Sequence, residues 1–388
     1  MKKILLTGLF IGFSLALLAQ KHTFTGQAEG WATVNPFNDF SAQLGGRYLP
    51  TYKFKYEKKD TFKLNFEASA HLYGNLNYEN SAWNEDGKLK PYRIYARYSN
   101  KQFEIRAGLQ KISFGSATML RPLMWFDQMD PRDPLQITDG VYALLARYYL
   151  INNTNFWLWT LYGNENPKGW EIAPSTKTRP EIGGRIQLPI GSGELGFTYH
   201  NREANFGESQ FAILNPLGKA QENKAGIDGK WDWHTGLWFE AMVRHQKLDG
   251  ITNPVVLQMA NEYFNPWLKQ INIGIDYTFG IGNGIVVMHE LLWNSSSKEV
   301  LGNNEDIFFS ALSANYPLGI INSITAMVYY DYTNESWYRF INWQQQYDHL
   351  SLYVMLFWNP DKFQIYQNVD ENNLFSGKGF QVKLVFNH

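Results

Sequence analysis

Strict alternation of apolar and polar residues constrains this chain more than any other feature of its sequence. The run at 379–388 shows it most clearly, with Phe380, Val382, Leu384 and Phe386 on one face of an extended strand and Gln381 and Lys383 on the other. Such a strand separates an apolar surface from a polar one. Because the apolar face is continuous and aromatic, we expect it to contact lipid, with a polar interior behind it.

The composition agrees with a membrane barrel and excludes several other classes. Aromatic residues make up 16% of the chain, with 23 Tyr and 14 Trp, the residues that gather at membrane interfaces. Apolar residues alternate after the first segment, which excludes a helical membrane protein. The net charge is -1, so we expect no nucleic-acid partner. The chain has no cysteine, which excludes disulfides, thiolate chemistry and a lipidated N-terminus.

The first residues have the pattern of a secretory signal. Lys2 and Lys3 precede an apolar run from Ile4 to Leu18, and Ala19 is a small residue at which a signal peptidase could cut. The run of about 15 residues is short for a membrane helix, although a membrane anchor is the alternative. We therefore predict a signal peptide at 1–19 and one barrel domain at 20–388 in the cell outer membrane.

Alternating segments predict about eighteen strands, with an uncertainty of about two. An even number is expected for a bacterial single-chain barrel. The segments are 22–33, 41–57, 61–76, 90–99, 102–113, 140–150, 154–163, 181–189, 194–202, 225–233, 235–247, 267–280, 284–294, 305–316, 321–332, 337–345, 350–358 and 377–386.

The connections between these segments fall into two classes. Those after even-numbered strands are short, whereas most of those after odd-numbered strands are long, at 77–89, 114–139, 164–180, 203–224, 248–266, 295–304 and 359–376. Short periplasmic turns and long extracellular loops are typical of outer-membrane barrels. A soluble sandwich or propeller has no reason to sort its loops in this way. The predicted fold is an all-β, transmembrane, antiparallel β-barrel of 16–18 strands.

The polar faces of the strands predict two charged walls in the lumen, which together would create a transverse field. The basic wall comprises Arg47, Lys53, Lys55, Lys63, Arg93, Arg97 and Arg106, and Leu109 on the same strand as Arg106 is assigned outward. The acidic wall comprises Asp228, Asp232, Glu240, Asp276, Glu290 and Asp331. The alternative is that these charges simply pair with their neighbours. The strand at 154–163 is apolar on both faces and receives no lumen assignment.

The long segment at 114–139 is too apolar for a solvated loop, and its prolines prevent a continued strand. We expect it to fold into the barrel and to bury Met124, Trp125 and Phe126. It would form a constriction by bringing five charged residues to the channel, Arg121, Asp127, Asp130, Arg132 and Asp133. The alternative is a cap that packs on the rim.

Three features of the sequence resemble known families or signals. The run 106–115, with Arg121-Pro122 and 130–134 after it, resembles the strand and loop of porin-like barrels near the alginate-export and phosphate-selective porin families, over about 30 residues. Those families often have Gly-Arg-Gln where this chain has Leu109 in place of the arginine. Gln20 after the signal resembles outer-membrane proteins of the Bacteroidota. The last strand, with Phe380 and Phe386, resembles the signal that the barrel assembly machinery recognises.

The resemblance implies a substrate-conducting barrel. We expect a porin-like channel for passive diffusion of small hydrophilic or anionic solutes, without a cofactor or catalytic activity. Its partners would be outer-membrane lipid, the assembly machinery, the solute, and other outer-membrane proteins or further copies of the chain. One alternative is a structural or accessory barrel of a larger complex. Another is a barrel enzyme acting on lipid, for which His245 or His289 would need a nearby serine.

Overall fold

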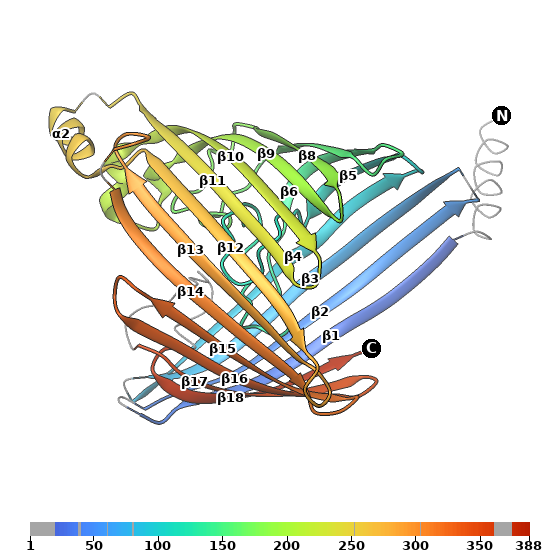
Figure 1. Cartoon of the computed structure of the whole chain (residues 1–388). Helices are drawn as coiled ribbons and strands as arrows, with labels where there is room; N and C mark the ends of the chain where they lie inside the picture. Colours follow the sequence, from blue (N-terminus) through green and yellow to red (C-terminus); the bar gives the residue numbers. More distant parts are fainter. Residues whose placement is uncertain are drawn as a thin grey trace, which may run out of the picture.

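Eighteen strands form one closed antiparallel barrel in the computed structural model, which describes residues 20–37, 40–59, 61–79, 81–251, 253–302, 304–360 and 375–388 (Figure 1). The predicted signal peptide at 1–19 lies outside these ranges. The first nine strands are β1 (Gln20–Asn35), β2 (Ser41–Lys58), β3 (Phe62–Glu79), β4 (Ala82–Ser99), β5 (Phe103–Gln110), β6 (Val141–Tyr149), β7 (Asn155–Leu161), β8 (Glu181–Ile190) and β9 (Gly193–Asn205). The others are β10 (Lys219–Asp232), β11 (Gly236–Asp249), β12 (Trp267–Phe279), β13 (Ile285–Ser297), β14 (Asn304–Pro317), β15 (Asn322–Asp331), β16 (Ser336–Gln346), β17 (Leu350–Trp358) and β18 (Lys378–Asn387).

Each strand pairs with its neighbours in chain order, and the last strand closes the ring. β18 pairs with β1 from Val34 opposite Phe380 to Gln27 opposite Asn387. The predicted antiparallel barrel of about eighteen strands is therefore confirmed. Over these residues the backbone groups of β1 and β18 bond to each other across the seam, as a sheet in lipid requires.

Burial in the strands is reversed relative to a soluble protein. On β3 the apolar Leu64, Phe66, Leu72 and Leu76 are exposed, whereas the polar Ser69, His71, Asn75 and Asn77 are buried. β18 follows the same rule, because its aromatic Phe380 and Phe386 are exposed while Gln381 and Lys383 are buried. A continuous apolar outer surface around a polar interior suits lipid outside and a polar lumen inside.

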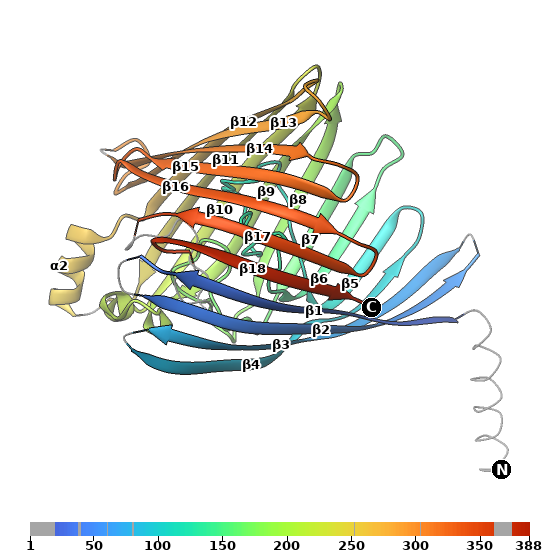
Figure 2. The ribbon, with the colours of Figure 1, turned by 90° about the horizontal axis from the view of Figure 1, so that it is seen from below.

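The two ends of the barrel carry different connections. At one end, here called the turn end, short turns join even-numbered strands to the next, for example residues 191–192 between β8 and β9. At the other end, the loop end, lie the segments 111–140, 162–180, 206–218 and 253–266, whereas most of the predicted loop at 359–376 falls outside the described residues. Figure 2 shows the helix α2 (Pro254–Tyr263) at the loop end and the C-terminus toward the opposite end. No helix among the described residues is long and apolar enough to cross a membrane.

One predicted long loop is wrong. Residues 77–89 are not a loop, because β3 continues to Glu79 and β4 begins at Ala82. The residues of β4 up to Leu89 are exposed on both faces. A strand without a buried face has no reason to alternate apolar and polar residues, so its sequence resembles that of a polar loop.

Candidate functional site

The segment between β5 and β6, residues 111–140, folds into the barrel and is here called the lumen loop. Figure 1 shows it inside the ring of strands. Met124, Trp125 and Phe126 are buried, as the sequence predicts. The alternative of a cap on the rim does not fit, because the lumen loop contacts inward side chains on β7, β11, β13 and β18.

Aromatic packing fixes the first half of the lumen loop against one wall. Phe114 stacks on Trp159 of β7 at 5.7 Å between ring centroids and meets Trp125 edge-on at 5.5 Å. Further along, Met119 and Leu120 join a second apolar cluster with side chains of β13 to β17. These contacts pack the lumen loop against β6 and β7 on one side and against β13 to β17 on the other.

Glu240 on β11 binds the backbone of the lumen loop. Its carboxylate accepts hydrogen bonds from the N–H groups of Ala117 at 2.8 Å and Leu123 at 2.9 Å. Gly115, whose φ is 95°, lies directly against this carboxylate, and any Cβ there would collide with it. The loop therefore needs glycine at this position in order to approach the wall.

Glu290 on β13 binds the next turn of the same backbone. Its two oxygens accept from the N–H groups of Thr118 at 2.7 Å, Met119 at 3.0 Å and Leu120 at 2.6 Å. The indole N–H of Trp238 donates a fourth bond at 3.2 Å. Glu240 and Glu290 thus lie on the lumen face, as predicted, but they hold the lumen loop rather than facing a solute.

The charged residues of the lumen loop mostly pair with one another. Arg121 donates to Asp127 at 3.0 Å, and Arg132 donates to Asp130 at 2.7 Å, with all four side chains buried. These four residues therefore stabilise the shape of the loop.

Asp133 instead reaches across the lumen to the seam where the barrel closes. It accepts from Lys383 of β18 at 2.9 Å and lies 3.8 Å from Arg47 of β2. Burial alone would raise the pKa of Asp133, but Lys383 and Arg47 outweigh burial and hold the pKa below its usual range. The lumen loop is consequently tied to opposite walls of the barrel.

The predicted basic wall divides into two groups. Arg47 pairs with Glu29, and Arg93 donates to the carbonyl oxygen of Thr138 in the lumen loop at 2.7 Å, so both buried guanidinium groups have partners. The remaining members lie nearer the turn end and pair with Glu57, Glu67 or Glu104; they are Lys53, Lys55, Lys63, Arg97 and Arg106. Neighbour pairing, the alternative weighed for these charges, therefore describes many of them.

The rest of the predicted acidic wall is dispersed. Asp228 is buried and accepts two hydrogen bonds from Arg185 of β8, one of them at 2.8 Å. Asp232 is exposed at the turn end, and Asp276 is half-buried. Asp331 binds the backbone of the turn at 333–334. These residues do not form one continuous carboxylate surface.

A second loop, residues 162–180, also enters the lumen, and the sequence did not predict this. Glu171 accepts from Lys224 of β10 at 3.0 Å and lies 3.1 Å from Arg202 of β9. Lys168 donates to Glu181 of β8 at 3.0 Å. The signal that could have revealed this network is the placement of charged residues on the inward faces of β9 and β10, where Arg202, Glu222 and Lys224 lie.

A cavity of about 480 Å³ remains between the lumen loop and the β2 to β4 wall. Its charged lining consists of four cations and two carboxylates, with His71 in addition: Arg47, Lys88, Lys90, Lys168, Asp139 and Glu165. Leu109 also lines it, which corrects its outward assignment. The preceding Gly108 has a φ of 120° and breaks the alternation of β5, so that both Leu109 and Gln110 are buried.

Within the described ranges, no group of three or more His, Cys, Asp or Glu side chains is arranged to hold a metal ion. His245 stacks on Trp267, and His289 lies 2.8 Å from the hydroxyl of Ser310. Both histidines belong to strand faces away from the cavity.

No protein-family model and no curated protein matches the sequence. Solved structures are similar in fold. OccAB4 of Acinetobacter baumannii has a TM-score of 0.55 at 9% identity, covering 95% of this chain and 97% of that chain. OmpT of Vibrio cholerae in its trimer form has a TM-score of 0.53 at 9% identity, with 95% and 100% covered. OmpF of Salmonella typhi, in complex with daunomycin, has a TM-score of 0.50 at 10% identity, with 95% and 98% covered. The chain thus has the fold of outer-membrane porins.

Proposed function

We propose that this protein is an outer-membrane channel for passive diffusion of small hydrophilic solutes, with a preference for anions. The observation that carries the proposal is the arrangement of the lumen loop. The lumen loop is anchored by Glu240, Glu290 and Asp133. It crosses the polar lumen and occupies one side of it, which narrows the lumen. A water-filled barrel with a fixed constriction is the architecture of a diffusion pore.

The preference for anions is inferred from the cavity beside the lumen loop. Its lining contains Arg47, Lys88, Lys90 and Lys168 against two carboxylates. Cations that line a passage raise the local concentration of anions. Alginate or phosphate as the solute, suggested by the resemblance over the 106–134 region, stays a prediction.

Planar-bilayer recording in a KCl gradient tests this proposal. We expect an open pore whose reversal potential shows anion preference. The double variant Lys88→Glu/Lys90→Glu should lower the anion-to-cation permeability ratio by roughly threefold, because two lining charges reverse. The matched control Lys58→Glu/Lys59→Glu reverses two exposed charges at the turn end. An equal change in both double variants would contradict selectivity at the cavity.

An accessory barrel within a larger complex is the second candidate. The specific observation in its favour is that the lumen loop and the segment 162–180 together occupy much of the interior with buried side chains. A barrel that stays silent in bilayers and co-purifies with other outer-membrane proteins would favour this candidate over the channel.

We further propose the cleaved signal at 1–19, the outer-membrane location and an assembly role for Phe380 and Phe386. Phe386 lies on the outer face of β18, opposite Ala28 of β1 and Leu350 of β17, where the ring closes. Phe386→Ala should reduce the amount of folded barrel in outer-membrane fractions by roughly half or more without changing the conductance of the barrels that insert. Normal insertion of the variant would contradict the assembly role.

A further inference from the structure

Arg244 of β11 is a cation of the barrel interior that has no ion-pair partner among the described residues. Met242 and Gln246, its neighbours at every second position, are buried, so Arg244 lies on the inward face of the strand. On that face it is opposite Lys224 of β10 and Leu268 of β12. Its side chain is half-buried, and its Nε is shielded from water without a hydrogen-bond partner. The Nη groups are not shielded in this way and stay reachable from the lumen.

The buried charges beside Arg244 already balance one another. Three cations and three carboxylates form a set of ion pairs with N–O distances of 2.5–3.2 Å. His200 touches this set without adding charge, because its Nδ1 accepts from the indole N–H of Trp159 at 3.3 Å. The set is therefore neutral, and the charge of Arg244 is in excess. Its members are Lys168, Arg202, Lys224, Glu171, Glu181 and Glu222.

The neighbouring charges do not supply a partner for Arg244. Glu222 and Glu171 attract it and Arg202 repels it, but all three of these residues are already in ion pairs. A charge that is partly removed from water and has no partner is costly. A guanidinium presents its N–H groups as a planar fork that matches two oxygens of a carboxylate or phosphate. An oxyanion bound at the Nη groups would remove this cost.

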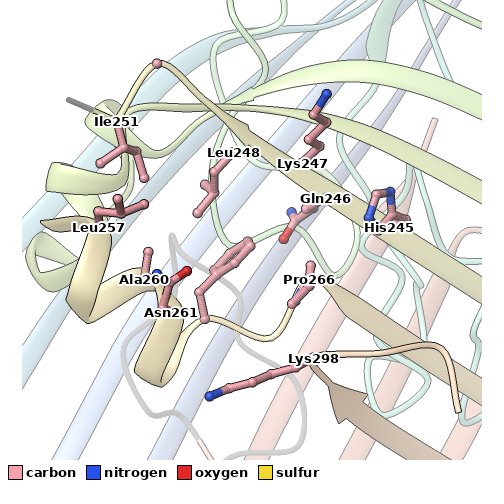
Figure 3. Close-up of a pocket in the computed structure, with 12 residues that line it drawn as sticks. His245, Gln246, Lys247, Leu248, Ile251, Leu257, Ala260, Asn261, Pro266 and Lys298 are labelled. Carbon is pink, nitrogen blue, oxygen red and sulfur yellow. The ribbon is translucent and has the colours of Figure 1, made fainter. Parts of the chain in front are cut away.

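Space remains beside Arg244 toward the loop end. Gln246 and Leu248, the next two inward positions of β11, line a cavity of about 510 Å³. Figure 3 shows this cavity between β11 and α2, with Leu257 and Ala260 of α2 opposite the strand. Successive inward positions of a strand are about 7 Å apart, so the cavity begins roughly one position from Arg244. The loop-end side of Arg244 is therefore hollow rather than closed by packed side chains.

We propose that Arg244 is the centre of a binding site for an oxyanion, a carboxylate or phosphate group, on the inward face of β11. The cavity of about 480 Å³ beside the β2 to β4 wall does not include Arg244 in its lining, so the two sites are separate. A permeating anion meets Arg244 on the other side of the lumen loop. This role in permeation rests on the proposed channel function, whereas binding of the oxyanion does not.

Chemical modification of the full-length barrel in detergent tests the site without recording a current. Phenylglyoxal modifies accessible guanidinium groups, and peptide mass spectrometry locates the modified residues. We expect Arg244 to react, and inorganic phosphate or acetate to slow its reaction by roughly threefold or more relative to chloride at equal ionic strength. An Arg244 that does not react, or that reacts equally fast in phosphate, acetate and chloride, would overturn the proposal.

Two other arginines serve as internal controls in the same experiment. Arg179 in the segment 162–180 has a side chain that is 65% exposed and pairs with Glu203, so it should react at the same rate in all three anions. Arg202 is buried and paired within the neutral set, so it should stay unmodified. Equal protection of Arg179 would indicate a general salt effect and overturn the assignment to Arg244.

Variants test whether the site acts on permeating anions. Arg244→Gln removes a charge that has no partner to lose, so it should fold as the wild type does and lower the anion-to-cation permeability ratio by roughly twofold. Arg244→Lys keeps the charge but not the planar fork, so it should restore most of the ratio measured in chloride but not that measured in acetate. The control Arg179→Gln removes an exposed guanidinium and should leave the ratio unchanged.

The labelling and the conductance measurements fail separately. A barrel that conducts no ions would refute the channel proposal and leave protection of Arg244 as support for the site. Protection of Arg244 by phosphate together with an unchanged permeability ratio in Arg244→Gln would confirm binding and overturn the role in permeation.

Discussion

The two sides of the lumen differ in how their polar groups are used. On the side of β7 to β13, Glu240, Glu290 and Glu171 are buried and bind loop backbone or buried cations. On the side of β2 to β4, lysines and Arg47 line a cavity. One side is occupied by packed side chains, and the other retains a cavity of about 480 Å³.

This difference shows that a charge on the inward face of a barrel strand does not by itself belong to the pore. A carboxylate that meets several N–H groups in a dry interior is a structural anchor, because those donors are costly to leave unpaired. A cation at the edge of a cavity can act on a passing solute. The carboxylate anchors and the cavity cations are both charged and both lie on inward strand faces. The role of each residue is therefore decided by the groups that surround it.

The largest effect should follow from removing the anchor at Glu290. Glu290→Ala leaves the N–H groups of 118–120 without an acceptor, at about 1–3 kcal/mol for each of the two donors on the buried Met119 and Leu120. We expect the lumen loop to detach from β13 and the single-channel conductance to rise roughly twofold. Conductance in planar bilayers, with folding checked by heat-modifiable gel mobility, measures both.

Two variants make that result specific to the anchor. Glu290→Gln keeps an acceptor oxygen and should change conductance less than the alanine variant does. Glu57→Ala removes an exposed carboxylate that pairs with Lys55 and Lys63 at the turn end. If Glu290→Ala conducts as the wild type does, the packing of the lumen loop against β13 does not depend on this carboxylate. The distinction between anchoring carboxylates and cavity cations then fails.

Alternation made the barrel predictable, because lipid and lumen impose opposite requirements at every second residue. Lys383 is an example, since its inward position follows from Phe380, Leu384 and Phe386 facing out, and the structure buries it beside Asp133. The same rule failed wherever one of the two requirements was missing. β4 up to Leu89 is exposed on both faces, and at Gly108 the backbone departs from the alternation.

The partners of the inward charges were beyond a strand-based prediction. Glu290 was correctly assigned to the lumen, but its backbone donors lie 170 to 172 residues earlier in the chain, in a segment without regular structure. Glu171 lies in what resembled an ordinary surface loop, although three buried cations surround it. Periodicity reports which face a residue occupies, whereas these contacts depend on how two long loops fold inside the ring.

A smaller effect on conductance is expected from Asp133, which ties the lumen loop to β18 and β2. Asp133→Asn removes the charge that faces Lys383 and Arg47, a loss of about 1.5–3 kcal/mol for a charge-assisted hydrogen bond. We expect a modest rise in conductance and noisier open-channel current, because one end of the lumen loop is released while Glu240 and Glu290 still hold the other.

The pH dependence of this contact has a defined sign. Because the pKa of Asp133 is lowered in the folded barrel, its stabilising effect is fully present above the ordinary carboxyl pKa and is lost as pH falls through the lowered value. The difference in current noise between wild type and Asp133→Asn should therefore be large at neutral pH and shrink under strongly acidic conditions. A difference that grows as pH falls would contradict this role.

The smallest effect should come from Lys53, which shares its strand face with Arg47 but lies nearer the turn end. Its side chain is 54% exposed and sits 3.9 Å from Glu67, so the pair contributes less than about 1 kcal/mol. Water and salt screen a charge in that position, so Lys53→Glu should leave unfolding unchanged and shift the reversal potential much less than Lys88→Glu/Lys90→Glu does. A single-site series, with Lys53→Glu, Lys88→Glu and Lys90→Glu recorded at the same ionic strength, makes the comparison per charge. If Lys53→Glu shifts the reversal potential as much as either cavity variant, selectivity arises from the summed charge of the whole basic wall, and the cavity has no special part in it.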